Sequence, residues 1–297
     1  MRSLPRFAAG CLFALSSAAA CATPFLFSTG DPDGRIGTAS RPGTGGTLEI
    51  ESADDFILGA ATEITHATFT GLLPPTATLT DIGSITVEIY RVFPADSDVA
   101  RTSGPPTFST SEVPTRVNSP SDVEFADRTS ASGQLTFNCS VLSPSFTVGN
   151  SVVNGINPLP NQNTSGEGAV TGQEVECALT FATPFVLAAD HYFFVPQVEL
   201  ANGTFLWLSA PRPIIVPGTA FVPDLQSWIR NENLAPDWLR VGTDIVGGTT
   251  FNAAFSLSGA LVAAVPEPGS LPLLLIALVS AVVLSHRVAR AGRSMHR

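Results

Sequence analysis

The chain contains no lysine, and charged residues make up only 13% of its 297 positions. Arginine therefore supplies all 15 basic residues, and six of these lie near the two ends of the chain. Between residues 23 and 264, nine arginines stand against 24 acidic residues, which gives this region a net charge of −15. Such a surface repels nucleic acid and anionic lipid headgroups, so we expect no nucleic-acid partner.

Motifs of common enzyme chemistry are also missing. The sequence has no GxSxG elbow, no HExxH zinc motif and no glycine-rich phosphate loop. Of the 4 histidines, only His66 and His191 lie far from the C-terminus, and each borders a predicted strand. We therefore predict a non-enzymatic protein without a cofactor. A hydrolase of unknown class is the alternative, and it would need one of these histidines beside carboxylates in a cleft.

The central region is rich in turn-forming residues and in alternating apolar patterns. The chain has 25 glycines and 24 prolines, which favour many short elements over long helices. Alternation predicts half-buried strands in four segments, and two further segments that are apolar on both sides read as central strands. These segments are residues 134–141, 174–181, 250–257 and 84–90, followed by 190–200 and 203–210. The pattern is typical of an antiparallel sandwich or barrel.

Three segments depart from this strand pattern. Residues 94–125 and 143–172 are rich in Ser, Pro, Asn and Thr, and both are longer than usual connections. They are either excursions packed on the surface or functional loops. Residues 224–240 indicate one short helix that ends at Pro236.

The first 22 residues have the three parts of a secretory signal peptide. Arg2 and Arg6 precede an apolar stretch, and small residues follow up to Ala22. Cleavage after Ala22 by signal peptidase would begin the mature chain at residue 23. Cleavage after Ala20 would instead expose Cys21, which leaves open whether that cysteine carries a lipid.

Export implies an oxidising compartment, where paired cysteines form disulfides. Cys139 and Cys177 each lie on the apolar face of a predicted strand. We therefore predict a disulfide between them, with two buried free thiols as the alternative. No CxxC or histidine pair accompanies these cysteines, so we expect no metal site there.

Two residue groups are candidates for ligand binding. Four acidic residues could supply the hard oxygen ligands that Ca²⁺ prefers, namely Asp31, Asp33, Asp54 and Asp55. The alternative is that they shape a turn and bond backbone amides. Trp228 and Trp238 could stack on extracellular polysaccharide, and their alternative role is core packing.

The last 35 residues have three consecutive parts. A short motif comes first, followed by an apolar run over Leu271–Ser285 and then by arginines. The motif residues are Val265, Pro266, Glu267 and Pro268, and the arginines are Arg287, Arg290, Arg293 and Arg297. A helix of 15 residues spans about 22 Å, and extension to Gly269–Ala289 makes a transmembrane span feasible. The arginines predict a cytoplasmic end.

This tripartite order resembles the PEP-CTERM sorting signal of Gram-negative bacteria. The resemblance implies recognition of Pro266–Pro268 by an exosortase-type processing enzyme, with transient residence in the inner membrane and delivery to the cell surface or an extracellular matrix. Residues 51–58, 84–94 and 191–200 also resemble the β-sandwich ectodomains common in such proteins.

We thus expect a signal peptide at 1–22, an all-β, jelly-roll-like sandwich at 23–263 and a sorting segment at 264–297. A carbohydrate-binding module for extracellular polysaccharide is the alternative function. Whether the C-terminal helix is kept or cut, and the oligomeric state, stay open.

Overall fold

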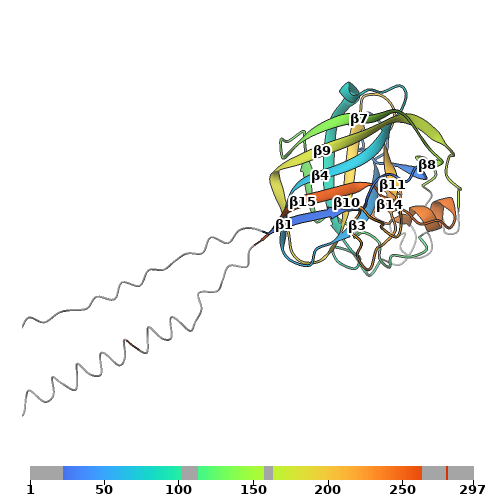
Figure 1. The fold of residues 1–297 in the computed structure, drawn as a ribbon. Coiled ribbons are helices and arrows are strands. Elements are labelled where there is room, and N and C mark those ends of the chain that lie inside the picture. The colour runs from blue at the N-terminus through green and yellow to red at the C-terminus, as the bar shows by residue number, and fades with distance from the viewer. Residues whose placement is uncertain (1–22, 102–112, 157–162, 263–278, 280–297) are drawn as a thin grey trace, which may run out of the picture. The chain divides into compact units, whose positions relative to one another are not determined.

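The computed structural model describes residues 23–101, 113–156, 163–262 and 279, and its strands form two sheets (Figure 1). The larger sheet has the order β1 (Pro24–Ser28), β15 (Phe255–Leu261), β4 (Thr62–Leu73), β11 (Leu206–Ala210), β2 (Ile36–Ala39) and β8 (Asn150–Val152). In the same sheet, β9 (Val170–Leu187) pairs with β4, β7 (Leu135–Val148) pairs with β9, and β14 (Asn252–Ala253) pairs with β11. The six-stranded sheet has the order β13 (Leu239–Arg240), β12 (Trp228–Asn231), β3 (Ile50–Ile57), β10 (His191–Leu200), β5 (Ile82–Arg91) and β6 (Ala126–Thr129).

Strand pairing is antiparallel throughout the described residues, except that β2 and β8 pair in parallel. Figure 1 shows β7, β9, β4, β15 and β1 side by side across the larger sheet. Between residues 23 and 262, the described part contains only two helical turns, Leu79–Asp81 and Val241–Val246. The predicted all-β fold with mainly antiparallel sheets is therefore confirmed.

An aromatic layer joins the two sheets. Phe194 of β10 stacks on Phe255 of β15 with 5.0 Å between ring centroids, and Trp207 of β11 meets both rings edge-on. Strand alternation places these side chains on the facing sides of the sheets, where burial of apolar area supplies most of the stability. The arrangement is consistent with a β-sandwich.

The outer face of the six-stranded sheet is also covered over part of its length. Tyr90, Phe193 and Val195 point to this face and pack with Leu225 and Trp238 from the chain that follows β11. The middle of β10 is therefore buried on both sides. This burial explains why residues 190–200 are apolar on both faces of the strand.

The predicted short helix at residues 224–240 is wrong. Trp228–Asn231 instead forms β12, because it pairs with β3 over four residues from Ala53 to Ile50. The segment 143–172 is also less irregular than predicted, since β7 continues to Val148 and β9 begins at Val170. In the segment 94–125, the described residues contain no strand.

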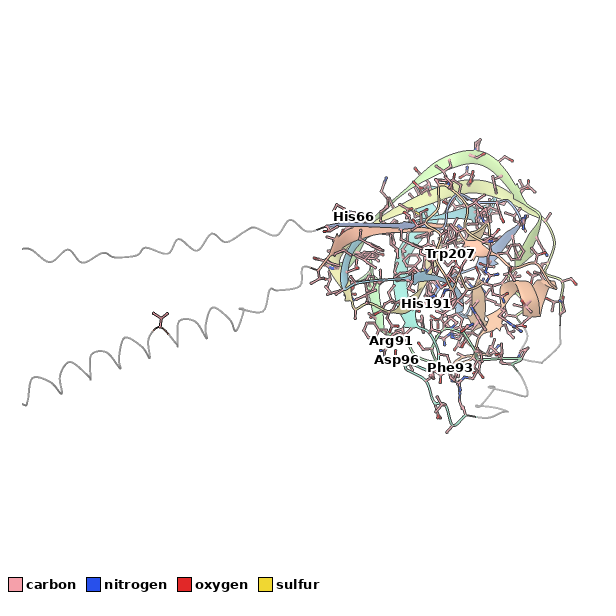
Figure 2. All side chains as sticks on the ribbon, turned by 60° about the horizontal axis from the view of Figure 1, so that its bottom comes forward. His66, Arg91, Phe93, Asp96, His191 and Trp207 are labelled. Carbon is pink, nitrogen blue, oxygen red and sulfur yellow. A yellow bond between two sulfur atoms is a disulfide. The ribbon has the colours of Figure 1, made fainter. Side chains whose placement is uncertain are left out.

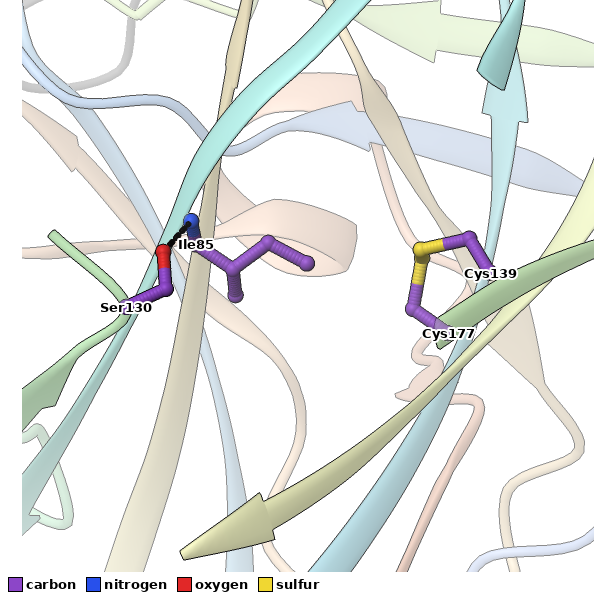
Figure 3. The surroundings of a disulfide bond; sticks show 4 residues. All are labelled: Ile85, Ser130, Cys139 and Cys177. Carbon is purple, nitrogen blue, oxygen red and sulfur yellow. Dashed lines mark hydrogen bonds between the residues drawn. A yellow bond between two sulfur atoms is a disulfide. The ribbon is translucent and has the colours of Figure 1, made fainter. Parts of the chain in front are cut away.

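The predicted disulfide between Cys139 and Cys177 is confirmed (Figure 3). The two cysteines lie directly opposite each other on β7 and β9, with their Cα atoms 4.0 Å apart. Cys177 is fully buried and belongs to the core between the sheets. The bond therefore ties the edge strand β7 to the body of the larger sheet.

Candidate functional site

The predicted signal peptide and sorting segment lie outside the described residues. This applies to Met1–Ala22, to the motif Val265–Pro268 and to the four terminal arginines. Within the part of the chain that the structure describes, no helix is long and apolar enough to cross a membrane.

The two candidate sugar-stacking tryptophans are buried. Trp228 is 1% exposed and Trp238 is 2% exposed. The Trp238 ring meets Tyr90 edge-on at 5.3 Å, and its Nε1 donates to the carbonyl of Ser121 at 3.0 Å. Neither ring face is free for a sugar, so both side chains act here in packing.

The four calcium candidates do not come together. Asp31 is exposed, and Asp33 accepts hydrogen bonds from the backbone of Arg35 and the hydroxyl of Ser209. Asp54 accepts from the amide of Ala253 at 2.8 Å, and Asp55 accepts from the amide of Leu225 at 3.1 Å. Among the described residues, no group of three His, Cys, Asp or Glu side chains could hold a metal ion.

Asp55 also forms a pair with His191. The Nε2 atom of His191 lies 2.6 Å from Oδ2 of Asp55, and the imidazole lies against Phe193 and Phe221. Burial raises the pKa of Asp55 to about 6, although the hydrogen bond to His191 opposes this rise. Burial and the nearby Asp55 charge raise the pKa of Asp54 well above its usual value.

The Asp55–His191 pair has no hydroxyl or thiol nucleophile among the described hydrogen-bond partners of the imidazole. No serine, threonine or cysteine side chain of the described residues bonds to His191. His66 lies on β4 in the other sheet, where it is exposed and contacts Thr65 (Figure 2). A nucleophile beside its base is the arrangement that acyl transfer needs, and these contacts do not provide it.

The densest polar group lies on the outer face of the six-stranded sheet. We call it the carboxyl cluster, and it consists of Glu49, Glu51, Glu88, Tyr90, Gln197 and Arg230. Alternation along β3, β5, β10 and β12 brings these side chains to one face, since Arg230 pairs with Glu51 and Glu88 pairs with Val195 in the strand register. Trp238 covers part of the cluster, because the guanidinium of Arg230 lies 4.3 Å from the centroid of the Trp238 ring.

Contacts within the carboxyl cluster are short and charge-assisted. Arg230 donates two hydrogen bonds to Glu51. Its Nε donates to Oε2, and a terminal nitrogen donates to Oε1 at 2.9 Å. The hydroxyl of Tyr90 lies 2.6 Å from Oε1 of Glu51 and 3.1 Å from Oε2 of Glu88. The amide of Gln197 donates to Glu49 at 3.1 Å. A bidentate arginine–carboxylate pair of this kind fixes orientation as well as charge.

The two central carboxyl groups have opposite pKa shifts. Burial, reinforced by the negative charge of Glu51, raises the pKa of Glu88 to about 9. Burial also disfavours the charged form of Glu51, but the charge and hydrogen bonds of Arg230 outweigh it and lower the pKa of Glu51. At neutral pH, Glu88 is therefore protonated beside an ionised Glu51.

Three side chains at the centre of this cluster are buried, while Glu88 is half-buried. Glu51 is 3% exposed, Tyr90 is 1% exposed and Arg230 is 6% exposed. The bonds among these three residues fix β3, β5 and β12 to one another. The candidate residues predicted from the sequence in this region are Asp54 and Asp55, and they include neither Glu51 nor Glu88. The alternation over 84–90 was the available signal, because it places Glu88 and Tyr90 opposite the apolar face.

A second ion-pair group anchors the cover of this face. One terminal nitrogen of Arg101 lies 2.8 Å from Asp122 and 2.7 Å from Asp237, and Arg116 lies 2.7 Å from Asp122. Burial raises the pKa of Asp237 to about 6, against the opposing charges of Arg101 and Arg116. These bonds connect the segment after β5 to the chain between β12 and β13.

Comparisons with known proteins give no relative for this chain. No protein-family model, no curated protein and no solved structure matches it.

Proposed function

We propose that this chain is an exported, non-enzymatic surface or matrix protein whose β-sandwich is delivered by the C-terminal sorting segment. One observation carries the proposal: every described strand lies between Pro24 and Leu261, within the range 23–263 expected for the exported domain. The first strand, β1, pairs along its whole length with the last, β15. The amide of Leu261 donates to the carbonyl of Thr23 at 2.8 Å, so the domain begins and ends at one place.

This geometry suits processing at both ends. Signal peptidase would cut before residue 23 and an exosortase-type enzyme would cut near Pro266–Pro268, and neither cut would remove any of the strands that the structure describes. The apolar run behind the motif would serve as a temporary inner-membrane tether, with the domain in the periplasm until it reaches the surface. Strand neighbours such as β1 and β15 that are distant in sequence support the jelly-roll-like order that belongs to this proposal.

Two further observations support the proposal. The Cys139–Cys177 disulfide suits an oxidising compartment outside the cytoplasm. Glu88 and Asp54, two carboxyl groups whose pKa is strongly raised, bond to partners within the fold, namely the hydroxyl of Tyr90 and the amide of Ala253. Such internal use of titratable groups fits a structural domain better than an enzyme.

The test is mass spectrometry of the mature C-terminus in strains with and without the exosortase-type enzyme. We expect a chain that ends near Pro266–Pro268 only when the enzyme is present. Replacing Pro266, Glu267 and Pro268 by alanine should leave Arg297 in place, whereas the control Pro272→Ala should still be cut. An intact Arg297 in both strains would overturn the sorting proposal and leave a permanent anchor.

A further inference from the structure

Two hollows meet at the end of β10. One has a volume of about 350 Å³ and lies against the loop from Arg41 to Thr47. The other has a volume of about 480 Å³ and is lined by Ser84, Ser130 and Phe137. Glu199 and Ala201 line both hollows, so the two adjoin at the end of this strand, and we call them together the groove. Both volumes lie within the range of about 300–1,000 Å³ that small-molecule sites occupy.

The wall formed by the Arg41 loop is held in place by its own bonds. Nε of Arg41 donates to the carbonyl of Leu48 at 3.2 Å, and a terminal nitrogen donates to the hydroxyl of Thr204 at 2.5 Å. Gly203 has a φ of +83°, and a Cβ there would lie 2.6 Å from Pro74. The turn after β10 therefore requires glycine at position 203, which lines the first hollow.

The opposite wall is fixed in a similar way. The hydroxyl of Ser84 donates to Oε2 of Glu199 at 2.7 Å, which leaves the other carboxylate oxygen without a described partner. The hydroxyl of Ser130 accepts from the amide of Ile85 at 3.0 Å and holds the β6–β7 turn to β5 (Figure 3). Phe137 is half-buried, with one side packed on the core while the residue also lines the hollow.

These groups match the chemistry of a sugar. A sugar ring has an apolar C–H face and a rim of hydroxyls, which suit an aromatic ring beside hydroxyl and carboxylate acceptors. An anionic polymer is disfavoured, because Glu199 lies at the centre of the groove and the region 23–264 has a net charge of −15.

We propose that the groove at the end of β10, with Glu199 at its centre and Phe137 on one wall, binds a segment of neutral polysaccharide. The sugar would place its apolar face on Phe137 and donate hydroxyl hydrogens to Glu199. This inference rests on the proposed export, because extracellular polysaccharide is met only outside the cell. It assigns sugar contact to residues other than Trp228 and Trp238.

The test is affinity electrophoresis of the full chain, purified in mild detergent, through native gels that contain dextran, mixed-linkage β-glucan, galactomannan or the anionic polymer alginate. We expect retardation by at least one neutral polysaccharide and none by alginate. Glu199→Gln should weaken the apparent Kd about tenfold or more, because it replaces a charged acceptor by a neutral one. Phe137→Leu should weaken it as well while keeping an apolar side chain at the core.

The matched control is Glu63→Gln, which removes the same charge from a half-exposed position on β4. This variant should bind like the wild type, and melting curves of all variants should show that they are folded. Absence of retardation in every neutral gel, equal retardation in alginate, or unchanged binding by both groove variants would overturn the proposal. Because binding is measured on purified chain, its failure is separate from a failure of C-terminal processing.

Discussion

At the scale of single residues, the fold strongly changes the ionisation of Glu88, whose pKa it raises to about 9. It shares the outer face of the six-stranded sheet with Glu51, and Arg230 neutralises only one of these two carboxyl groups. A carboxyl group left without a cation beside an ionised neighbour keeps its proton. The cluster is therefore stable with one proton in it, and its stability must depend on pH.

Glu88→Gln should stabilise the protein at alkaline pH. The folded pKa of Glu88 is about 9, above the ordinary value of 4.5, so between these values the unfolded chain has released a proton that the folded chain keeps. Wild-type stability therefore falls as pH rises through this window and levels off above it. Glutamine does not titrate, and its amide can still donate to Glu51.

Melting curves from pH 5 to pH 9 measure this effect. The difference in Tm between Glu88→Gln and wild type should increase with pH across this range. At pH 9 the variant should melt about 2–4 °C or more above wild type, which corresponds to about 1 kcal/mol in a domain of this size. The exposed Glu124→Gln serves as control and should show no such trend. A constant difference between Glu88→Gln and wild type at all pH values would contradict the assignment.

At the scale of elements, the edge strand β7 depends on its disulfide. Among the described strands it pairs only with β9, and its register shifts twice along their contact. The Cys139–Cys177 bond closes a loop with a sequence separation of 38 residues. On the chain-entropy model such a closure stabilises by about 4 kcal/mol.

Replacing both Cys139 and Cys177 by alanine should therefore lower the Tm by about 8–16 °C. Calorimetry of the variant and of reduced wild type checks this, and the two should melt at similar temperatures because both lack the closed loop. An unchanged Tm in the double variant would show that β7 is held by its backbone bonds to β9 alone.

Sequence patterning predicted strands better than it predicted the site. Alternation over 84–90 and 174–181 gave the faces of β5 and β9, because one side of each strand is buried in the core. It failed for Trp228, whose local surroundings indicated a helix, because pairing with β3 is a contact between segments about 175 positions apart in the chain. The groove and the carboxyl cluster need strand order as well as strand position, and no local pattern contains that order.

At the scale of the whole molecule, Asp54 and Asp55 also show that the neighbouring sequence does not reveal contacts with distant segments. Asp54 and Asp55 looked like metal ligands because they are adjacent and acidic. Their oxygens instead bond the amides of Ala253 and Leu225, which belong to segments far along the chain. The fold thus closes through bonds between its early and late segments, and the antiparallel pair of β1 and β15 joins its first and last described strands.

This closure predicts that residues 23–262 keep the stability of the full chain. All described strands and all three apolar clusters lie within that range, so its Tm should match that of the full chain within about 2 °C, while loss of about 1 kcal/mol would shift it by about 2–4 °C. A chain of residues 23–254 is the control. It lacks β15, which lies between β1 and β4 and contributes Phe255 to the aromatic layer, so it should not melt cooperatively. If the 23–262 fragment also failed to melt cooperatively, the flanking segments would be part of the fold, and cuts at both ends could not release an intact domain.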